Sequence, residues 1–223
     1  VAAQMVCLEL AAGPVNVKNA DLNRMYESHQ DFDENGPAAK AVRRTLGLLA
    51  EVFFDKTPEL ERYNAVALYC VFAELQRMYV IASIKPELRG WFLEFEKKRR
   101  LQEELDEEHA DTEWVTYKER ISHSTDAQES IRFRMDFMLR HLLSKFPALL
   151  LKDNQRGFTH LQKLAVFRRD NQVCQVKLKC EGIRVEWDNW HCDHKTAWSK
   201  GGATTVANGQ VSCPACNLAK GGD

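Results

Sequence analysis

The sequence has no long run of apolar residues and no leader-like start. No stretch approaches the roughly 18 to 20 consecutive apolar residues of a membrane-spanning helix, and no charged segment followed by an apolar one opens the chain. We therefore expect a cytoplasmic protein with no membrane partner. Because the chain starts at Val1 rather than Met, we also expect it to be part of a longer protein.

The glycine motifs that bind nucleotide phosphates are absent as well. Neither GxxxxGK[ST] nor GxGxxG occurs, and the chain has no internal repeat and no low-complexity tract. A nucleotide site is therefore not expected within these 223 residues. The apolar fraction of 44% is large enough for a packed core.

The net charge of −1 conceals an uneven distribution. Residues 156–223 carry ten Lys and Arg against six Asp and Glu, whereas residues 1–155 carry 21 against 26. A basic tail on an acidic body is compatible with a tail that meets phosphate. Scattered solvated charge explains the same counts equally well.

Helical patterns dominate from about residue 19 to residue 151. Apolar residues recur at three- and four-residue spacing, which predicts helices at residues 38–54, from residue 57 to about residue 79, and at residues 126–145. Thr57 with Pro58 is expected to start the second helix, and Ser124 with Thr125 the third. The charged segment between them, residues 93–113, predicts a solvated helix or a mobile connection.

The pattern changes near residues 147–156, where we place a domain boundary. A short helix is expected at residues 159–167, followed by β-prone pieces, a Gly201-Gly202 turn and a small helix that starts at Pro214. The chain is thus expected to be mainly α, with a helical domain at residues 1–155 and a small domain at residues 156–223.

Five of the seven cysteines fall between residues 174 and 216. Since disulfides are disfavoured in a reducing cytoplasm, this clustering points to a metal site. Cys213 and Cys216 form a CxxC knuckle, and Cys174 with Cys180 is the expected partner pair, which together would give a closed four-thiolate zinc site. The C-x5-C spacing of the second pair departs from the commoner CxxC, so Cys192 stays open as a rival ligand.

A second group of residues in the tail carries chemistry. It consists of the tetrad His191-Cys192-Asp193-His194, the Gly-Gly turn, Asn208, and the run Cys213-Pro-Ala-Cys216-Asn217-Leu-Ala-Lys220. These motifs and spacings resemble those of the HNH, or ββα-metal, endonucleases. The resemblance covers about a third of the chain. It departs from the family at Lys195-Thr196-Ala197, where apolar residues and a proline are more usual.

The resemblance implies a zinc-stapled ββα fold that hydrolyses phosphodiester bonds of DNA, most simply double-stranded DNA, and leaves 5′-phosphate ends. His194 is the expected general base, because an imidazole accepts a proton near neutral pH. Asp193 and Asn217 offer the oxygen ligands that Mg²⁺ or Mn²⁺ prefers. By the resemblance, Asn208 holds the loop and the His194 side chain in place rather than binding metal.

Contacts with DNA are expected from the basic residues of the tail. The candidates are Lys200, Lys220, Arg168, Arg169 and His191, each of which could also be plain surface. The tryptophans of the tail, Trp187, Trp190 and Trp198, could stack on bases, although packing within the domain is the more usual role of tryptophan.

The helical region has a resemblance of its own. The segments LNRMYESHQDF, ISHSTDAQESIRFRM and RGFTHLQKLAVFRRDNQVCQ look like GmrSD-type proteins, bacterial restriction factors directed against phage DNA. That family would add an N-terminal, ParB-like nucleotide-dependent sensor domain as a partner of this chain. The alternative function is a zinc-stabilised module that binds DNA without cutting it. A further reading makes the helical domain a platform for protein interactions.

Overall fold

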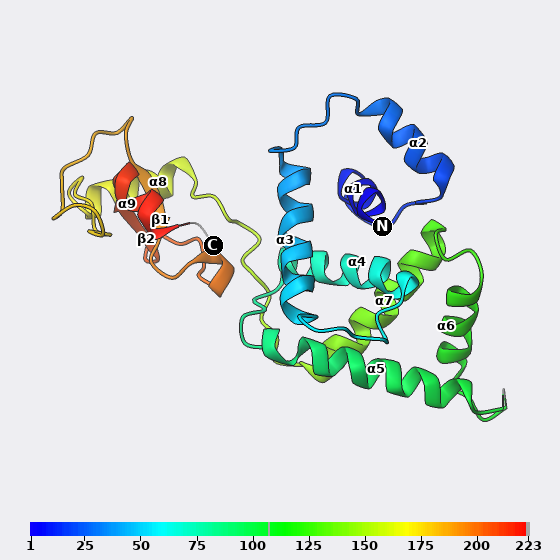
Figure 1. Cartoon of the computed structure of the whole chain (residues 1–223). Coiled ribbons are helices and arrows are strands. Elements are labelled where there is room, and N and C mark those ends of the chain that lie inside the picture. Colours follow the sequence, from blue (N-terminus) through cyan, green and yellow to red (C-terminus); the bar gives the residue numbers. More distant parts are fainter. Residues whose placement is uncertain (107, 222–223) are drawn as a thin grey trace. The chain divides into compact units, whose positions relative to one another are not determined.

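The computed structural model describes residues 1–106 and 108–221, and Glu107 of the charged segment lies outside that range. The described residues form helices and one small sheet (Figure 1). The α-helices are α1 (Ala2–Leu10), α2 (Asn19–Ser28), α3 (Pro37–Val52), α4 (Arg62–Met78), α5 (Leu88–Glu103), α6 (Thr112–Ser122), α7 (Gln128–Lys145), α8 (His160–Arg169) and α9 (Pro214–Lys220). Short 3-10 helices occur at Lys85–Glu87 (η1) and Trp198–Lys200 (η2), and the strands are β1 (His191–His194) and β2 (Gly209–Ser212). The expected mainly α fold is confirmed.

The chain divides into two compact units. Unit 1 consists of Val1–Arg77 and Ser83–Leu149, and unit 2 of Met78–Ala82 and the chain from Leu150 onward. The short segment 78–82 joins unit 2 through backbone bonds, in which the Val80 N–H donates to the Leu150 carbonyl and the Lys152 N–H to the Met78 carbonyl. The division falls a few residues before the boundary expected at residue 155.

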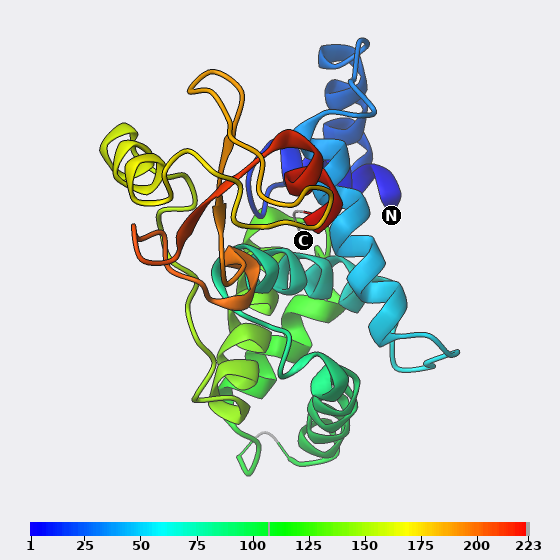
Figure 2. The ribbon, with the colours of Figure 1, turned by 90° about the vertical axis from the view of Figure 1, so that its left-hand side faces the viewer.

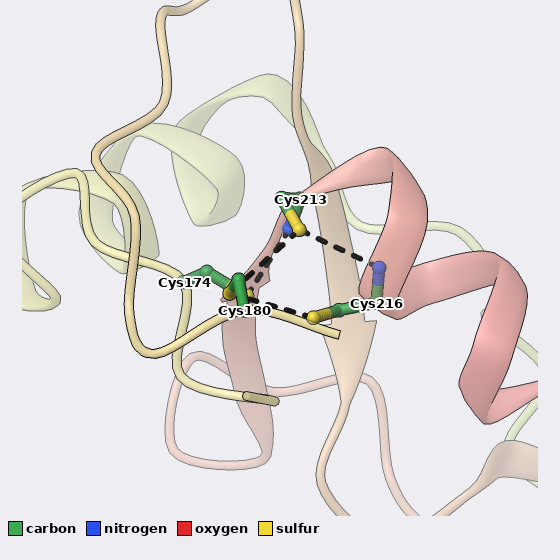
Figure 3. A group of neighbouring side chains, drawn as sticks. All are labelled: Cys174, Cys180, Cys213 and Cys216. Atoms are coloured by element: carbon green, nitrogen blue, oxygen red, sulfur yellow. Dashed lines mark hydrogen bonds between the residues drawn. The ribbon is translucent and has the colours of Figure 1, made fainter. Parts of the chain in front are cut away.

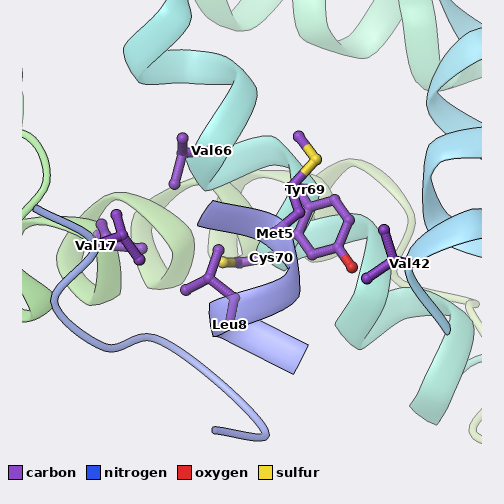
Figure 4. Packing of buried hydrophobic residues seen from close by; sticks show 8 residues of the cluster. Met5, Leu8, Val17, Val42, Val66, Tyr69 and Cys70 are labelled. Atoms are coloured by element: carbon purple, nitrogen blue, oxygen red, sulfur yellow. The ribbon is translucent and has the colours of Figure 1, made fainter. Parts of the chain in front are cut away.

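Unit 1 is a set of helices around apolar cores. Figure 4 shows Met5 and Leu8 of α1 against Tyr69 and Cys70 of α4, with Val42 of α3 beside them. A second group of rings joins α5, α6 and α7, where Phe95, Trp114, Tyr117, Phe137 and His141 lie 4.8 to 6.0 Å apart between ring centroids. The regular apolar spacing of these helices is thus accounted for by burial.

Two expected helix starts are wrong. Thr57 does not cap α4, because its hydroxyl donates to the Asp55 carbonyl and its own carbonyl accepts from the Leu60 N–H, which closes a turn around Pro58. The helix starts five residues later, at Arg62. Helix α7 starts at Gln128, whose N–H donates to the side chain of Asn16, 112 residues away in sequence.

The charged segment is more structured than expected. Its first part forms the end of α5, where Glu96 and Arg99 are buried and paired, with 2.8 Å between Arg99 Nε and Glu96 Oε2. Asn64 Nδ2 donates to the other carboxylate oxygen at 3.0 Å. A buried pair keeps its charges only with such partners, so this face of α5 belongs to the core.

Unit 2 is built around a short antiparallel hairpin. His191 pairs with Ser212, Cys192 with Val211, Asp193 with Gln210, and His194 with Gly209. Figure 2 shows α9, in red, following directly from β2. Helix α8 packs on the hairpin through Val166 and Phe167, and Thr159 caps it with a reciprocal bond to Gln162.

No helix among the described residues combines the length and apolar character needed to cross a bilayer.

Candidate functional site

Four cysteines of unit 2 come together although they are spread over 43 residues. Cys174 and Cys180 lie in the loop after α8, Cys213 follows β2 as the N-cap of α9, and Cys216 lies in the first turn of α9 (Figure 3). Their Sγ atoms all lie within 4.8 Å of one another. Ligands 2.3 Å from a tetrahedral zinc are about 3.8 Å apart, so the cluster could hold one zinc ion.

Backbone amides point at these sulfurs. The Cys213 N–H donates to Cys174 Sγ at 3.3 Å and the Lys179 N–H to Cys216 Sγ at 3.2 Å. The N–H groups of Ile183 and Gly182 lower the pKa of Cys180 to about 6, whereas burial raises that of Cys213 to about 11. A metal binds cysteine as the thiolate, which such N–H donors stabilise. Cys192, the rival ligand, lies outside the cluster, and burial raises its pKa to about 12.

His194 ends β1 with its ring held from two sides. Its Nε2 lies 3.0 Å from Thr204 Oγ1, and its ring centroid lies 4.4 Å from that of Phe158. The Thr204 hydroxyl donates its only proton to the Gln155 carbonyl. Thr204 can therefore only accept from His194, which puts the imidazole proton on Nε2 and leaves the lone pair on Nδ1.

The surroundings also favour an uncharged His194. Burial lowers its pKa, and Lys220 and Arg156 lower it further, while Asp193 and Asp153 oppose the shift. The downward direction prevails, so the ring is a proton acceptor at neutral pH.

Asp193 takes part in a separate set of contacts. Its Oδ2 accepts from Gln210 Nε2 at 2.8 Å and from Lys220 Nζ at 2.6 Å. The Lys220 ammonium also donates to the His194 carbonyl. Asn217, one turn before Lys220 on α9, lines a pocket together with His194. A metal ion bound through Oδ2 would have to replace the Lys220 ammonium there.

Asn208 ties down the loop between the strands. Its Oδ1 accepts from the Thr196 N–H at 2.9 Å, and its Nδ2 donates to the carbonyls of Thr196 and Ala203 at 3.0 and 2.9 Å. Gly202 lies under this bridge, since a Cβ there would be 1.9 Å from the Thr196 oxygen. A glycine is thus needed at position 202, where two backbone segments approach closely. Both the oxygen and the nitrogen of the Asn208 side-chain amide form hydrogen bonds.

The same part of the chain matches a known protein family. Residues 172–223 match the family model of HNH endonucleases. This segment is an HNH domain. Searches of curated proteins and of solved structures gave no match. The HNH domain contains both the cysteine cluster and the Asp193-His194 pair, and it places this part of the chain in a nuclease family. Helix α8 and the segment before it lie outside the match.

The basic residues expected at DNA have different surroundings. Arg169 braces the HNH domain, pairing with Asp170 at 2.7 Å and donating to the carbonyls of Val206 and Gly209. Arg168 and Lys200 are exposed, and Lys220 is held by Asp193. Of the five candidates, His191 lines the pocket that contains His194.

Sequence reasoning missed several residues that surround the HNH histidine. Thr204 and Gln155 hold its ring, and Arg156 and Lys163 supply charge to the same pocket. The available signal was the segment 156–169, just ahead of the HNH match, which carries four Lys and Arg and no Asp or Glu. Nothing local marked Thr204, because its partners lie 10 and 49 residues away.

Proposed function

We propose that this protein is a metal-dependent endonuclease that hydrolyses phosphodiester bonds of double-stranded DNA. The observation that carries the proposal is the setting of His194. One ring nitrogen is anchored by Thr204 and the other keeps a lone pair, in a pocket that also contains Asn217, Arg156 and Lys163. A base beside cations is what hydrolysis of a phosphodiester requires.

In this proposal His194 takes a proton from the attacking water at Nδ1, and the Thr204 hydroxyl keeps the imidazole in that orientation. Asn208 acts at a distance by fixing the loop that carries Thr204. The hydrogen bond from Asn208 Nδ2 to the carbonyl of Ala203, the residue before Thr204, supports this positioning role.

Asp193 and Asn217 are the proposed ligands of a catalytic Mg²⁺ or Mn²⁺. Both offer oxygen, and the Lys220 ammonium at Asp193 marks a place where positive charge is stable. When bound, such an ion would neutralise charge that develops on the phosphate. The zinc cluster is proposed to be structural, because four thiolates leave no open position.

The test is nicking of supercoiled plasmid by the whole chain. We expect relaxed and linear DNA with 5′-phosphate ends when Mg²⁺ or Mn²⁺ is added, and no product when only the bound zinc is present. DNA binding without cutting in either metal would support the rival function, a zinc-stabilised DNA-binding module. If the protein neither bound nor cut DNA, both functions would be contradicted.

We further propose that the nuclease serves in restriction of phage DNA, together with an N-terminal nucleotide-dependent domain. The support is the resemblance of the helical region to GmrSD-type proteins. Cells that express the complete reading frame should then reduce phage plating, and the His194→Ala version should not. Equal plating on both kinds of cell would contradict this role.

A further inference from the structure

A pocket of about 550 Å³ lies beside the HNH histidine. The residues that line it come from the segment before α8 and its first turn, from β1, and from the loop that carries Trp187 and Trp190. His194 and Asn217 line it as well, so whatever fills the pocket lies next to the proposed catalytic groups.

The pocket is cationic. Arg156 and Lys163 line it, together with three histidines, and none of its lining residues is an Asp or Glu. Neither cation makes an ion pair among the described residues. Lys163 opposes the rise that burial causes in the pKa of Cys192, and Arg156 adds to the lowering that burial causes in the pKa of His194. Unpaired charge of one sign in a hollow attracts anions.

Arg156 is held in place while its donors stay available. Its guanidinium carbon lies 5.4 Å from the centroid of the Trp198 ring, which is a cation–π contact. Trp198 itself is anchored by its Nε1–H, which donates to the Asp153 carbonyl at 2.8 Å. Such a guanidinium is suited to bidentate binding of a phosphate.

Trp187 provides an aromatic surface in the same pocket. It is 42% exposed, and its position is fixed by edge contacts with Phe167 and His160, at 5.0 and 5.7 Å between ring centroids. Trp190 packs against it at 5.6 Å. A partly exposed indole that is held by neighbouring rings can stack on a nucleobase.

We propose that this pocket binds an unpaired nucleotide of the DNA strand, next to the bond that is cut. Arg156 and Lys163 hold its phosphate, and its base stacks on Trp187. A base can reach an indole only after it leaves the helical stack, so the enzyme favours DNA with a mismatched or extruded base at this position. This inference rests on the proposed nuclease function, because it takes the DNA strand as the ligand.

Binding is measured with the whole chain and its zinc, without added Mg²⁺ or Mn²⁺, by fluorescence anisotropy. The probes are a 20-base-pair duplex and the same duplex with one central mismatch. Trp187→Ala should weaken binding of the mismatched duplex by at least ~5-fold and leave the paired duplex unchanged. Trp187→Phe should restore most of the preference.

Lys163→Gln and Arg156→Gln should weaken binding of both duplexes. Each should also reduce the slope of log affinity against log salt by about 0.9, the loss expected for one phosphate contact. Lys177→Gln is the matched control, because Lys177 is an exposed cation of the same unit that does not line the pocket. It should bind both duplexes like the unchanged protein.

The inference is overturned if the unchanged protein binds both duplexes equally, or if the Trp187 and Lys163 variants bind like the Lys177→Gln control. Zinc content and the circular dichroism spectrum exclude an unfolded variant. Plasmid nicking separates the two levels of the argument. Nicking that persists while pocket variants bind normally contradicts the pocket alone, and pocket-dependent binding without nicking contradicts the nuclease alone.

Discussion

At the scale of single residues, the orientation of one imidazole depends on one hydroxyl. Thr204 is 4% exposed and links His194 Nε2 to the Gln155 carbonyl, so it decides which ring nitrogen carries the proton. Its own backbone is fixed too, since its N–H donates to Asp153 Oδ2 at 2.7 Å and its carbonyl accepts from Gln162 at 2.9 Å. Residues that orient a proposed catalytic group through hydrogen bonds are usually important for activity.

Replacing this hydroxyl should therefore impair catalysis without unfolding the protein. Thr204→Val keeps the shape but cannot accept from His194, and we expect plasmid nicking to slow about 10- to 100-fold. Thr204→Ser should nick at close to the original rate. The nitrogen spectrum of the imidazole, assigned with His194→Ala, should show the Nε2–H form in the unchanged and Ser proteins and a mixture in the Val protein. An unaltered spectrum and rate in Thr204→Val would contradict the positioning role.

The sequence offered candidates for this site but not their partners. The resemblance to HNH endonucleases was enough to propose Asp193, His194, Asn208 and Asn217, because a ββα hairpin imposes such spacings over short distances. Thr204 could not be found from local spacing, since Gln155, whose carbonyl accepts its hydroxyl proton, lies 49 residues away in the sequence. Arg169 was expected at phosphate on charge alone, and its bonds to the carbonyls of the HNH loop were equally hidden.

At the scale of secondary structure, the cysteine cluster connects the loop after α8, strand β2 and helix α9. The two strands of unit 2 have four residues each, so hairpin hydrogen bonds alone hold little. A four-thiolate zinc contributes folding free energy of about 10 kcal/mol or more in small domains. We infer that the metal is what keeps these elements together.

Cysteine variants test that inference. Cys180→Ser and Cys216→Ser should lower zinc, measured by mass spectrometry, well below one per chain and remove the tryptophan signal of a folded unit 2. Cys192→Ser is the control and should keep one zinc per chain. The helices of unit 1 should melt unchanged in all three, which also tests whether the two proposed domains fold separately. Loss of zinc from Cys192→Ser alone would reassign the fourth ligand.

The sequence predicted the helices whose apolar residues are buried. It did not predict the helix ends that depend on residues far away in the chain. The apolar stripes of α3 and α7 were sufficient to predict those helices, and the short helix expected at residues 159–167 corresponds to α8. The start of α7 depends on Asn16, which no local rule could supply. Helix α5 was misjudged because Glu96 and Arg99 read as solvated, whereas they neutralise one another inside the core.

At the scale of the whole molecule, the family model matches residues 172–223, which lie in unit 2, and the searches of curated proteins and solved structures gave no match. The charge is divided in the same way, since the basic residues exceed the acidic ones only in the tail. The proposal therefore places DNA contact and cutting in unit 2. The role of unit 1 in sensing or partner binding follows only from its resemblance to restriction factors.

The central claim is that His194 is the general base of a DNA endonuclease. The measurement is the rate of plasmid nicking with Mn²⁺ by the His194→Ala protein, beside His123→Ala, which removes an exposed histidine of unit 1. We predict that His194→Ala nicks at least ~100-fold more slowly than the unchanged protein while it binds the same DNA, and that His123→Ala is unaffected. An undiminished rate in His194→Ala would contradict the account.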